Sequence, residues 1–322
     1  MTDYQPNHLL STLGPFHPPK VDKQAIKPSI AQRITIKVTD PVNHEAPAIL
    51  HSPRTTPTTT RPPSAVVLVS GAGGGISGPA GIYSSLADKI ALLLCIPCLR
   101  LDYREPARTE YCVADMQAAF DYLCDNFGAT CFVIVGWSFG GSPCFTVAAR
   151  EPVRVAGVAT IASQTAKTDG VRALSPRPML LLHGEEDRVL APSCSKTLFN
   201  LYGGDGDREM KLYPGDDHGL TRSAVQVEGK LFGFVVKCLG LSERLGYDVL
   251  WQAGRDLVEG REERVREMEM GRDLEDVHVK RTILSILEEA DRLKTKEFHE
   301  IQLNHRRIMN SSTPFEQNIS AV

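Results

Sequence analysis

The chain has 322 residues, a length that suits one large domain with appendages or two small domains. Its composition, 42% hydrophobic and 23% charged, is that of an ordinary globular protein with a substantial core. The net charge of −3 argues against a nucleic-acid partner, and no apolar run reaches about eighteen residues, which argues against a membrane span.

The beginning of the chain predicts a flexible arm followed by a β-hairpin. Residues 1–29 contain five prolines and no apolar run, so we expect a loosely held arm and no secretory signal. Apolar and polar residues alternate over 30–39, which is typical of a strand with one buried face, and 47–52 is predicted to be its hairpin partner. The Pro- and Thr-rich segment 53–63 predicts a long loop.

From residue 65 onward, short apolar runs alternate with helix-like segments. We predict strands at 65–70, 96–103, 130–136, 155–162, 178–184 and 208–214. The helix-like segments lie near 80–94, 110–126, 138–150 and 221–239. Strands buried on both faces that alternate with helices indicate an α/β domain, residues 30–245, with a mostly parallel, doubly wound sheet covered by helices on both faces.

The remaining residues, 246–322, predict a charged extension that is helical or partly disordered. Residues 261–276 carry eleven charges in sixteen positions, as in a solvated helix or a disordered stretch. An apolar seam with 4-3-4-3 spacing follows at Val279, Ile283, Ile286, Ala290 and Leu293. Two heptads do not establish a coiled coil, so three alternatives stay open: docking on the domain, a homodimer through the extension, or no stable fold.

The eight cysteines mostly lie inside apolar segments. This is typical of free, buried thiols in a reducing compartment, so we expect a cytoplasmic protein. Cys95 and Cys98 have the spacing of a redox pair, but no second pair accompanies them and they do not open a helix. We interpret both as core cysteines.

A single serine stands among glycines where a predicted strand becomes a helix. A doubly wound sheet binds its ligands at the carboxyl ends of its strands, and the run after 130–135 is Gly136-Trp137-Ser138-Phe139-Gly140. A serine on a tight strand-to-helix turn projects its hydroxyl from the sheet, and the flanking glycines prevent collisions where strand and helix nearly touch. We predict that Ser138 is a nucleophile.

A serine nucleophile requires a base, and histidine is the natural one at neutral pH. Of the nine histidines, only His218 lies between the last predicted strand and the last predicted helix. Its neighbours Asp216, Asp217 and Gly219 suit an exposed loop. His183 ends a strand and is expected to pack and hydrogen-bond locally.

The third group of a catalytic triad is an acid that holds the imidazole in the correct tautomer. The segment after strand 178–184 offers Glu185, Glu186 and Asp187. We choose Asp187, with either glutamate as the alternative. The chain order Ser138, Asp187, His218 is the order that this architecture uses.

Together these motifs resemble the α/β-hydrolase superfamily. The segment GWSFGG (136–141) resembles its nucleophile elbow, HGEEDRV (183–189) the region of its acid, and DHG (217–219) its histidine loop. LDYRE (101–105) also resembles the Asp-Tyr-Arg segment of many members. The resemblance spans about residues 30–242 and implies the α/β-hydrolase fold.

The resemblance also implies an oxyanion hole, with one departure from the family pattern. Members commonly carry His-Gly before the oxyanion loop, where this chain has Ser70-Gly71. Backbone N–H groups stabilise the oxyanion and do not need that side chain. We therefore assign the hole to the N–H groups of Ala72 and Phe139, with Gly73 as the alternative to Ala72.

Two further segments predict the character of the pocket. Residues 105–107 read Glu-Pro-Ala where many relatives are Gly-rich, which is expected to reshape one pocket wall. Only fifteen residues, 163–177, are available where lipases insert a cap. The chain therefore resembles the compact dienelactone-hydrolase-like branch, but with a serine nucleophile and an open site.

We expect a serine hydrolase that cleaves a carboxylic ester or thioester of a small to medium substrate through an acyl-enzyme intermediate. No cofactor or metal is expected, because no His/Cys/Asp cluster has ligand spacing. Two alternatives remain: a peptidase or amidase of the same fold, and a non-catalytic scaffold that acts as a binding protein. Such scaffolds usually lose a triad residue, whereas this chain keeps all three.

Overall fold

The computed structural model describes residues 29–53 and 63–242, together with 245, 246, 249 and 253. Nearly all of the predicted N-terminal arm lies outside these residues. The apolar seam of the C-terminal extension also lies outside them, as does any dimer that it would form.

The described part of the chain contains one mixed, mostly parallel sheet of eight strands in the order β1-β2-β4-β3-β5-β6-β7-β8. The strands are β1 (Ser29–Val38), β2 (His44–Pro53), β3 (Ser64–Val69), β4 (Cys98–Leu101), β5 (Cys131–Trp137), β6 (Val155–Ile161), β7 (Met179–Gly184) and β8 (Arg208–Tyr213). From β4 to β8 all pairings are parallel, whereas β1 pairs antiparallel with β2 and β2 antiparallel with β4. The predicted hairpin and parallel strands are confirmed, although β4 is shorter than its predicted range of 96–103.

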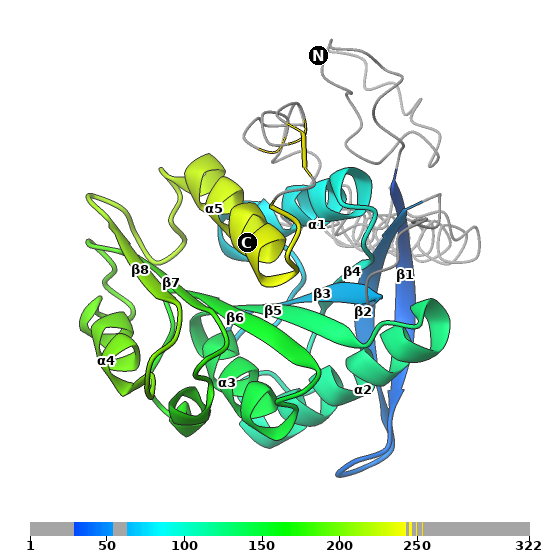
Figure 1. Ribbon diagram of the computed structural model, residues 1–322. Helices are drawn as coiled ribbons and strands as arrows, with labels where there is room; N and C mark the ends of the chain where they lie inside the picture. Colours follow the sequence, from blue (N-terminus) through cyan, green and yellow to red (C-terminus); the bar gives the residue numbers. More distant parts are fainter. Residues whose placement is uncertain (1–28, 54–62, 243–244, 247–248, 250–252, 254–322) are drawn as a thin grey trace, which may run out of the picture. The chain divides into compact units, whose positions relative to one another are not determined.

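Helices cover both faces of the sheet. They are α1 (Ile82–Leu93), α2 (Thr109–Phe127), α3 (Gly141–Arg150), α4 (Ser193–Leu201) and α5 (Ala224–Cys238), with short 3₁₀ helices at Pro79–Gly81, Ser138–Gly140 and Asp169–Ala173. In Figure 1, α1 and α5 lie on one face of the sheet, and α2, α3 and α4 lie on the other. The sequence predicted four of these five α-helices and missed α4.

Each face of the sheet carries its own apolar core. Phe132 and Ile134 of β5 belong to the core under α2 and α3, and Phe132 stacks on Phe120 of α2 with ring centroids 4.1 Å apart. Val133 and Val135, the alternate residues of the same strand, belong to the core under α1 and α5. Because successive side chains of a strand point to opposite faces, an unbroken apolar run is what a strand buried on both faces requires.

The sheet has its topological switch point at β3. This strand pairs with β4 on one side and with β5 on the other, so the chain runs from β3 to β4 and then crosses back over β3 to β5. Its last residue, Val69, is opposite Gly136 of β5. The segment that follows β3 therefore begins beside the segment that follows β5, at the edge where open α/β sheets bind ligands.

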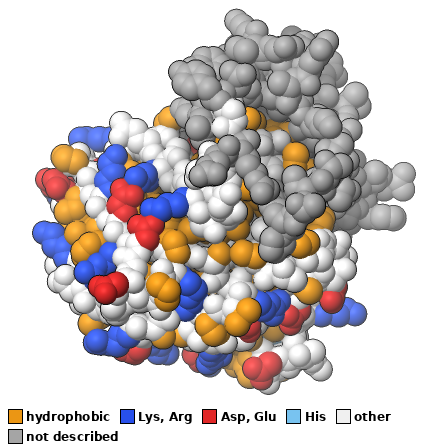
Figure 2. All heavy atoms as spheres, in the orientation of Figure 1, with side chains coloured by type: hydrophobic (Ala, Val, Ile, Leu, Met, Phe, Trp, Pro, Cys, Tyr) orange, Lys and Arg blue, Asp and Glu red, His pale blue; other side chains and the backbone are white. Residues whose placement is uncertain are grey.

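The surface drawn in Figure 2 carries interspersed cationic and anionic side chains, as expected for a chain with a net charge of −3. Among the described residues, no helix combines the length and the apolar character needed to cross a bilayer.

Ala253 shows that the packed unit extends past the predicted domain end at residue 245. Its side chain is 4% exposed and belongs to the core between α1, α5 and the sheet. Its carbonyl accepts a 2.9 Å hydrogen bond from the buried ammonium of Lys89. We therefore propose that the domain ends beyond Ala253 and that the extension begins later.

Candidate active site

Ser138 lies on a strained turn at the carboxyl end of β5. Its φ of 55° is in the left-handed region, which non-glycine residues rarely occupy. A Cβ on Gly136 would come within 2.4 Å of the Gly140 carbonyl oxygen, and a Cβ on Gly140 within 2.6 Å of the Ser70 carbonyl oxygen. Both glycines are therefore required because the helix starts in contact with the strand and with the neighbouring loop.

The three predicted triad residues are in hydrogen-bond contact. His218 Nε2 lies 3.0 Å from Ser138 Oγ, and His218 Nδ1 lies 2.7 Å from Asp187 Oδ2. The groups come from the ends of β5, β7 and β8. The alternative acids Glu185 and Glu186 are exposed, and within the described residues the carboxylate bonded to His218 is that of Asp187.

Backbone hydrogen bonds hold the Asp187 carboxylate in place. Its Oδ1 accepts the N–H groups of Val189 and Leu190 at 2.8 and 2.9 Å, which folds the turn after β7 around the carboxylate. The second oxygen is left to face His218. Asp187 is 8% exposed, so little water competes for it.

His183 contacts the same carboxylate oxygen of Asp187 as His218 does. Its Nε2 lies 2.9 Å from the Leu190 carbonyl oxygen and 3.1 Å from Asp187 Oδ2, and its Nδ1 lies 2.7 Å from Ser195 Oγ. Burial lowers the pKa of His183, although the Leu190 carbonyl and Asp187 act in the opposite direction. A neutral imidazole whose Nε2 faces two acceptors carries its proton on Nε2. In His183, Nε2 therefore donates, and Nδ1 accepts a hydrogen bond from the hydroxyl of Ser195.

His183→Gln is expected to lose less stability than the native protein when the pH is lowered. A lowered folded-state pKa means that the stability due to neutral His183 is complete above about pH 6.5, the value in the unfolded chain, and is lost as pH falls toward the folded pKa. Glutamine does not titrate, and its amide can still donate. Melting temperatures at about pH 7.5 and 5.5 should fall less for His183→Gln than for the native protein; equal losses would contradict this assignment.

The loop that carries His218 is folded around Asp216. The Asp216 carboxylate is fully buried and accepts the N–H groups of Asp217, Arg222 and Ser223 at 3.0, 3.1 and 2.9 Å. The expectation that Asp216 suits an exposed loop is therefore wrong. Its carboxylate turns inward because three backbone donors converge on it.

Two further contacts hold His218 near the serine. The indole N–H of Trp137 donates to the His218 carbonyl oxygen at 3.1 Å, and the two rings lie 5.7 Å apart. A Cβ on Gly184 would come within 2.4 Å of the carbonyl oxygens of Asp216 and Asp217. The close approach of this loop to β7 explains why a glycine follows His183. The sequence motifs alone did not indicate that Trp137 and Gly184 help to position His218.

The segment after β3 lies against the nucleophile. A Cβ on Gly71 would be 3.3 Å from Ser138 Cβ, and the next residue, Ala72, is exposed. On the other side of the serine, Phe139 lies in the first turn of the helical segment, where backbone N–H groups have no acceptor within the helix. Backbone donors are therefore available on both sides of Ser138.

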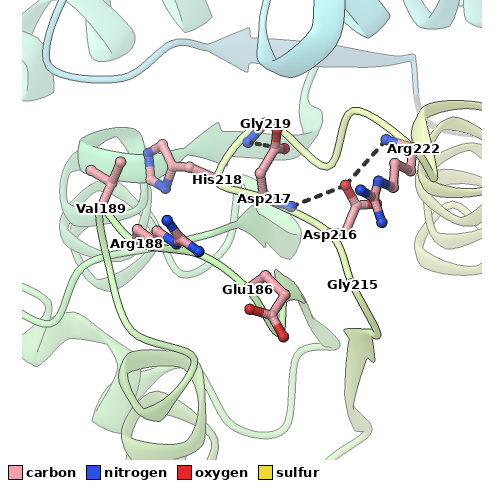
Figure 3. A pocket seen from close by; sticks show the side chains of 9 residues that line it. All are labelled: Glu186, Arg188, Val189, Gly215, Asp216, Asp217, His218, Gly219 and Arg222. Carbon is pink, nitrogen blue, oxygen red and sulfur yellow. Dashed lines mark hydrogen bonds between the residues drawn. The ribbon is translucent and has the colours of Figure 1, made fainter.

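A pocket of about 720 Å³ adjoins the triad at His218 (Figure 3). It lies between the loop after β7, with Glu186, Arg188 and Val189, and the loop after β8. Partial burial opposes ionisation of Asp217 in this pocket, but hydrogen bonds from Thr221 and Gly219 outweigh it and lower its pKa. His218 lines this pocket and Ser138 does not, so the pocket lies on the histidine side of the triad. Within the described residues, no group of three or more His, Cys, Asp or Glu side chains is placed to hold a metal ion.

The architecture and the elbow together define the α/β-hydrolase fold. Residues 64–191 match the family described as "alpha/beta hydrolase fold". No curated protein sequence matches the chain significantly.

Solved structures share the fold at low sequence identity. Est1E from Butyrivibrio proteoclasticus is 14% identical, with a TM-score of 0.55 over 65% of this chain and 99% of that one; it has also been solved with ferulic acid bound. The esterase domain of a Rhodothermus marinus protein is 17% identical, with a TM-score of 0.51 over 64% and 98%. Dienelactone hydrolase from Anabaena variabilis is 16% identical, with a TM-score of 0.53 over 66% and 99%. The predicted resemblance to the superfamily, dienelactone hydrolase included, is thus confirmed at the level of the fold.

Proposed function

We propose that this protein is a serine hydrolase that cleaves a carboxylic ester or thioester of a small to medium substrate through an acyl-enzyme intermediate. The observation that carries the proposal is the continuous contact from Ser138 Oγ to His218 and on to Asp187, at 3.0 and 2.7 Å. A buried carboxylate fixes Nδ1 of His218 as the donor, so the lone pair of Nε2 faces the serine hydroxyl.

In the first half of the reaction, Ser138 Oγ attacks the carbonyl carbon of the substrate. Its proton passes to His218 Nε2, and Asp187 stabilises the imidazolium that forms. The tetrahedral intermediate collapses when the alcohol or thiol leaves with the proton from His218. The product of this half is an ester between Ser138 and the acyl group.

In the second half, water attacks the acyl-enzyme. His218 takes a proton from the water, and a second tetrahedral intermediate forms. His218 then returns this proton to Ser138 Oγ as the bond between Oγ and the acyl carbon breaks and the acid is released. We assign the oxyanion of both intermediates to the N–H groups of Phe139 and Ala72, with Gly73 as the alternative to Ala72. The close approach of Gly71 to the Ser138 side chain supports this assignment, because Ala72 is the next residue of the same loop.

The surroundings of the site favour a substrate that does not need to be enclosed. Residues 163–177 contain only a short 3₁₀ helix, Asp169–Ala173, and no cap. Val189 is 69% exposed at the rim of the pocket beside His218. We therefore propose short esters or thioesters ahead of long-chain lipids, and the cytoplasmic location stays a prediction.

A panel of p-nitrophenyl esters of increasing chain length, a thioester, methyl ferulate and a p-nitroanilide tests the proposal. We expect turnover of short esters or thioesters and slower or no turnover of the anilide. A fluorophosphonate probe should label Ser138, as identified by peptide mass spectrometry. Labelling at another serine would contradict the assignment, and faster anilide cleavage would favour the peptidase alternative.

A further inference from the structure

The loop that would supply half of the oxyanion hole has a glycine-rich backbone. Residues 71–78, here called the glycine loop, read GAGGGISG between β3 and the turn that leads into α1. Gly74, Gly75 and Gly78 have φ values of 73°, 89° and 67°. Glycines in such conformations leave a free loop with many accessible backbone states. An oxyanion donor is effective only when it is held in place before the reaction.

Asp102, directly after β4, holds the middle of this loop. Its Oδ1 accepts the N–H of Gly75 at 2.7 Å, the short distance of a hydrogen bond to a carboxylate. A Cβ on Gly74 would come within 2.9 Å of the same oxygen, so the loop lies directly against the carboxylate. The N–H of Gly74 in turn donates to the Gly71 carbonyl at 3.1 Å. This closes the turn that contains Ala72.

A side chain of β4, that of Arg100, holds a second peptide group of the loop. Arg100 is fully buried, and its Nη1 donates to the Ile76 carbonyl at 3.2 Å and to Ser84 Oγ at 2.9 Å. Its Nε donates to His51 Nε2 at 3.1 Å, and His51 Nδ1 faces the Asp88 carboxylate at 2.8 Å. The guanidinium is therefore fixed by buried partners on β2 and α1.

Arg100 lies in β4 and Asp102 directly follows the last residue of that strand, so one short segment carries both side chains. They hold groups of two neighbouring residues, the N–H of Gly75 and the carbonyl of Ile76, on either side of the peptide bond that joins these residues. Two anchors on neighbouring residues restrict both the position and the rotation of that part of the loop. Pro106 adds a packing contact, since a Cβ on Gly74 would be 3.0 Å from its Cγ.

We propose that Asp102 is a positioning residue for the oxyanion hole, and that it acts by holding the glycine loop so that the Ala72 N–H faces the carbonyl oxygen of the substrate. Arg100 holds the same loop through its hydrogen bond to the Ile76 carbonyl. This inference rests on the proposed function. Asp102 takes no proton and does not touch the substrate; it acts through the loop on the stability of the tetrahedral intermediate.

The test compares Asp102→Ala with Asp102→Asn on the best ester of the panel. Alanine removes the acceptor for the Gly75 N–H, so kcat should fall by about 10- to 100-fold while KM stays within about threefold, because the hole acts on the transition state. Asparagine retains an acceptor oxygen and should recover most of the loss. Asp125→Ala, which removes an exposed carboxylate on α2, is the matched control and should match the native protein.

Two further measurements separate positioning from general damage. Amide hydrogen exchange over residues 72–76 should accelerate in Asp102→Ala, with little change in melting temperature. Gly74→Ala should lower kcat in the same way, since its Cβ would displace the Asp102 carboxylate.

An unchanged kcat in Asp102→Ala would overturn the inference while leaving the proposed function intact. An Asn variant as slow as the Ala variant would also overturn it, because the charge and not the hydrogen bond would then matter. A native protein that neither turns over an ester nor reacts with the fluorophosphonate would overturn both.

Discussion

Replacing Ser138 with alanine is expected to lower kcat by about 10⁴-fold or more, and replacing His218 in addition should lower it no further. The reason is that the two groups act as one unit. Without the hydroxyl there is no nucleophile for His218 to activate, and without His218 the hydroxyl keeps its proton. The 3.0 Å contact between Ser138 Oγ and His218 Nε2 makes this dependence direct.

The measurement is the kcat of Ser138→Ala, His218→Ala and the double variant on one ester, with melting temperatures recorded alongside. Ser193→Ala, an exposed serine on α4, is the matched control and should keep native activity. If the effects of the two single substitutions multiplied in the double variant, the residues would act independently and the triad would be wrong. Ser138→Ala should leave the fold and the melting temperature unchanged, because serine and alanine both carry a Cβ at the φ of 55° and the serine contributes chemistry rather than packing.

The sequence predicted the triad because its chemistry lies in short motifs at the ends of strands. Unbroken apolar runs located β5, β7 and β8, and parallel strands bring their carboxyl ends to one edge of the sheet. Ser138, Asp187 and His218 each follow one of these runs, so the sheet brings together residues up to 80 positions apart. The role of the glycines around Ser138 was also predictable, because the strand and the helix that approach each other there are neighbours in the sequence.

Features that depend on distant packing were not predictable in this way. Helix α4 was missed because it is short and buries only Ser195 and Leu198, which gives almost no apolar stripe. Asp216 was expected in an exposed loop, although its three backbone donors bury it. The contact of Asp102 with Gly75 joins residues 27 positions apart and follows no motif spacing.

The largest effect on stability is expected at a buried ion pair between α1 and α5. Lys89 Nζ lies 2.8 Å from Glu228 Oε1, and both side chains are fully buried. Ser85 Oγ donates to the same carboxylate at 2.6 Å, and Lys89 also donates to the Ala253 carbonyl. The pair therefore joins two helices and the segment that follows α5.

Replacing Glu228 with glutamine is expected to lower the free energy of unfolding by about 3–5 kcal/mol, because the Lys89 ammonium would stay buried without a counter-charge. The double variant Lys89→Met/Glu228→Leu should recover most of this loss, since it buries no charge. Urea titrations at neutral pH provide the measurement. The control is Glu209→Gln in the half-exposed pair with Lys230, where the loss should stay below about 1 kcal/mol. A Glu228→Gln loss as small as that of the control would show that water or another group compensates Lys89, and the pair would then not be what holds α1 to α5.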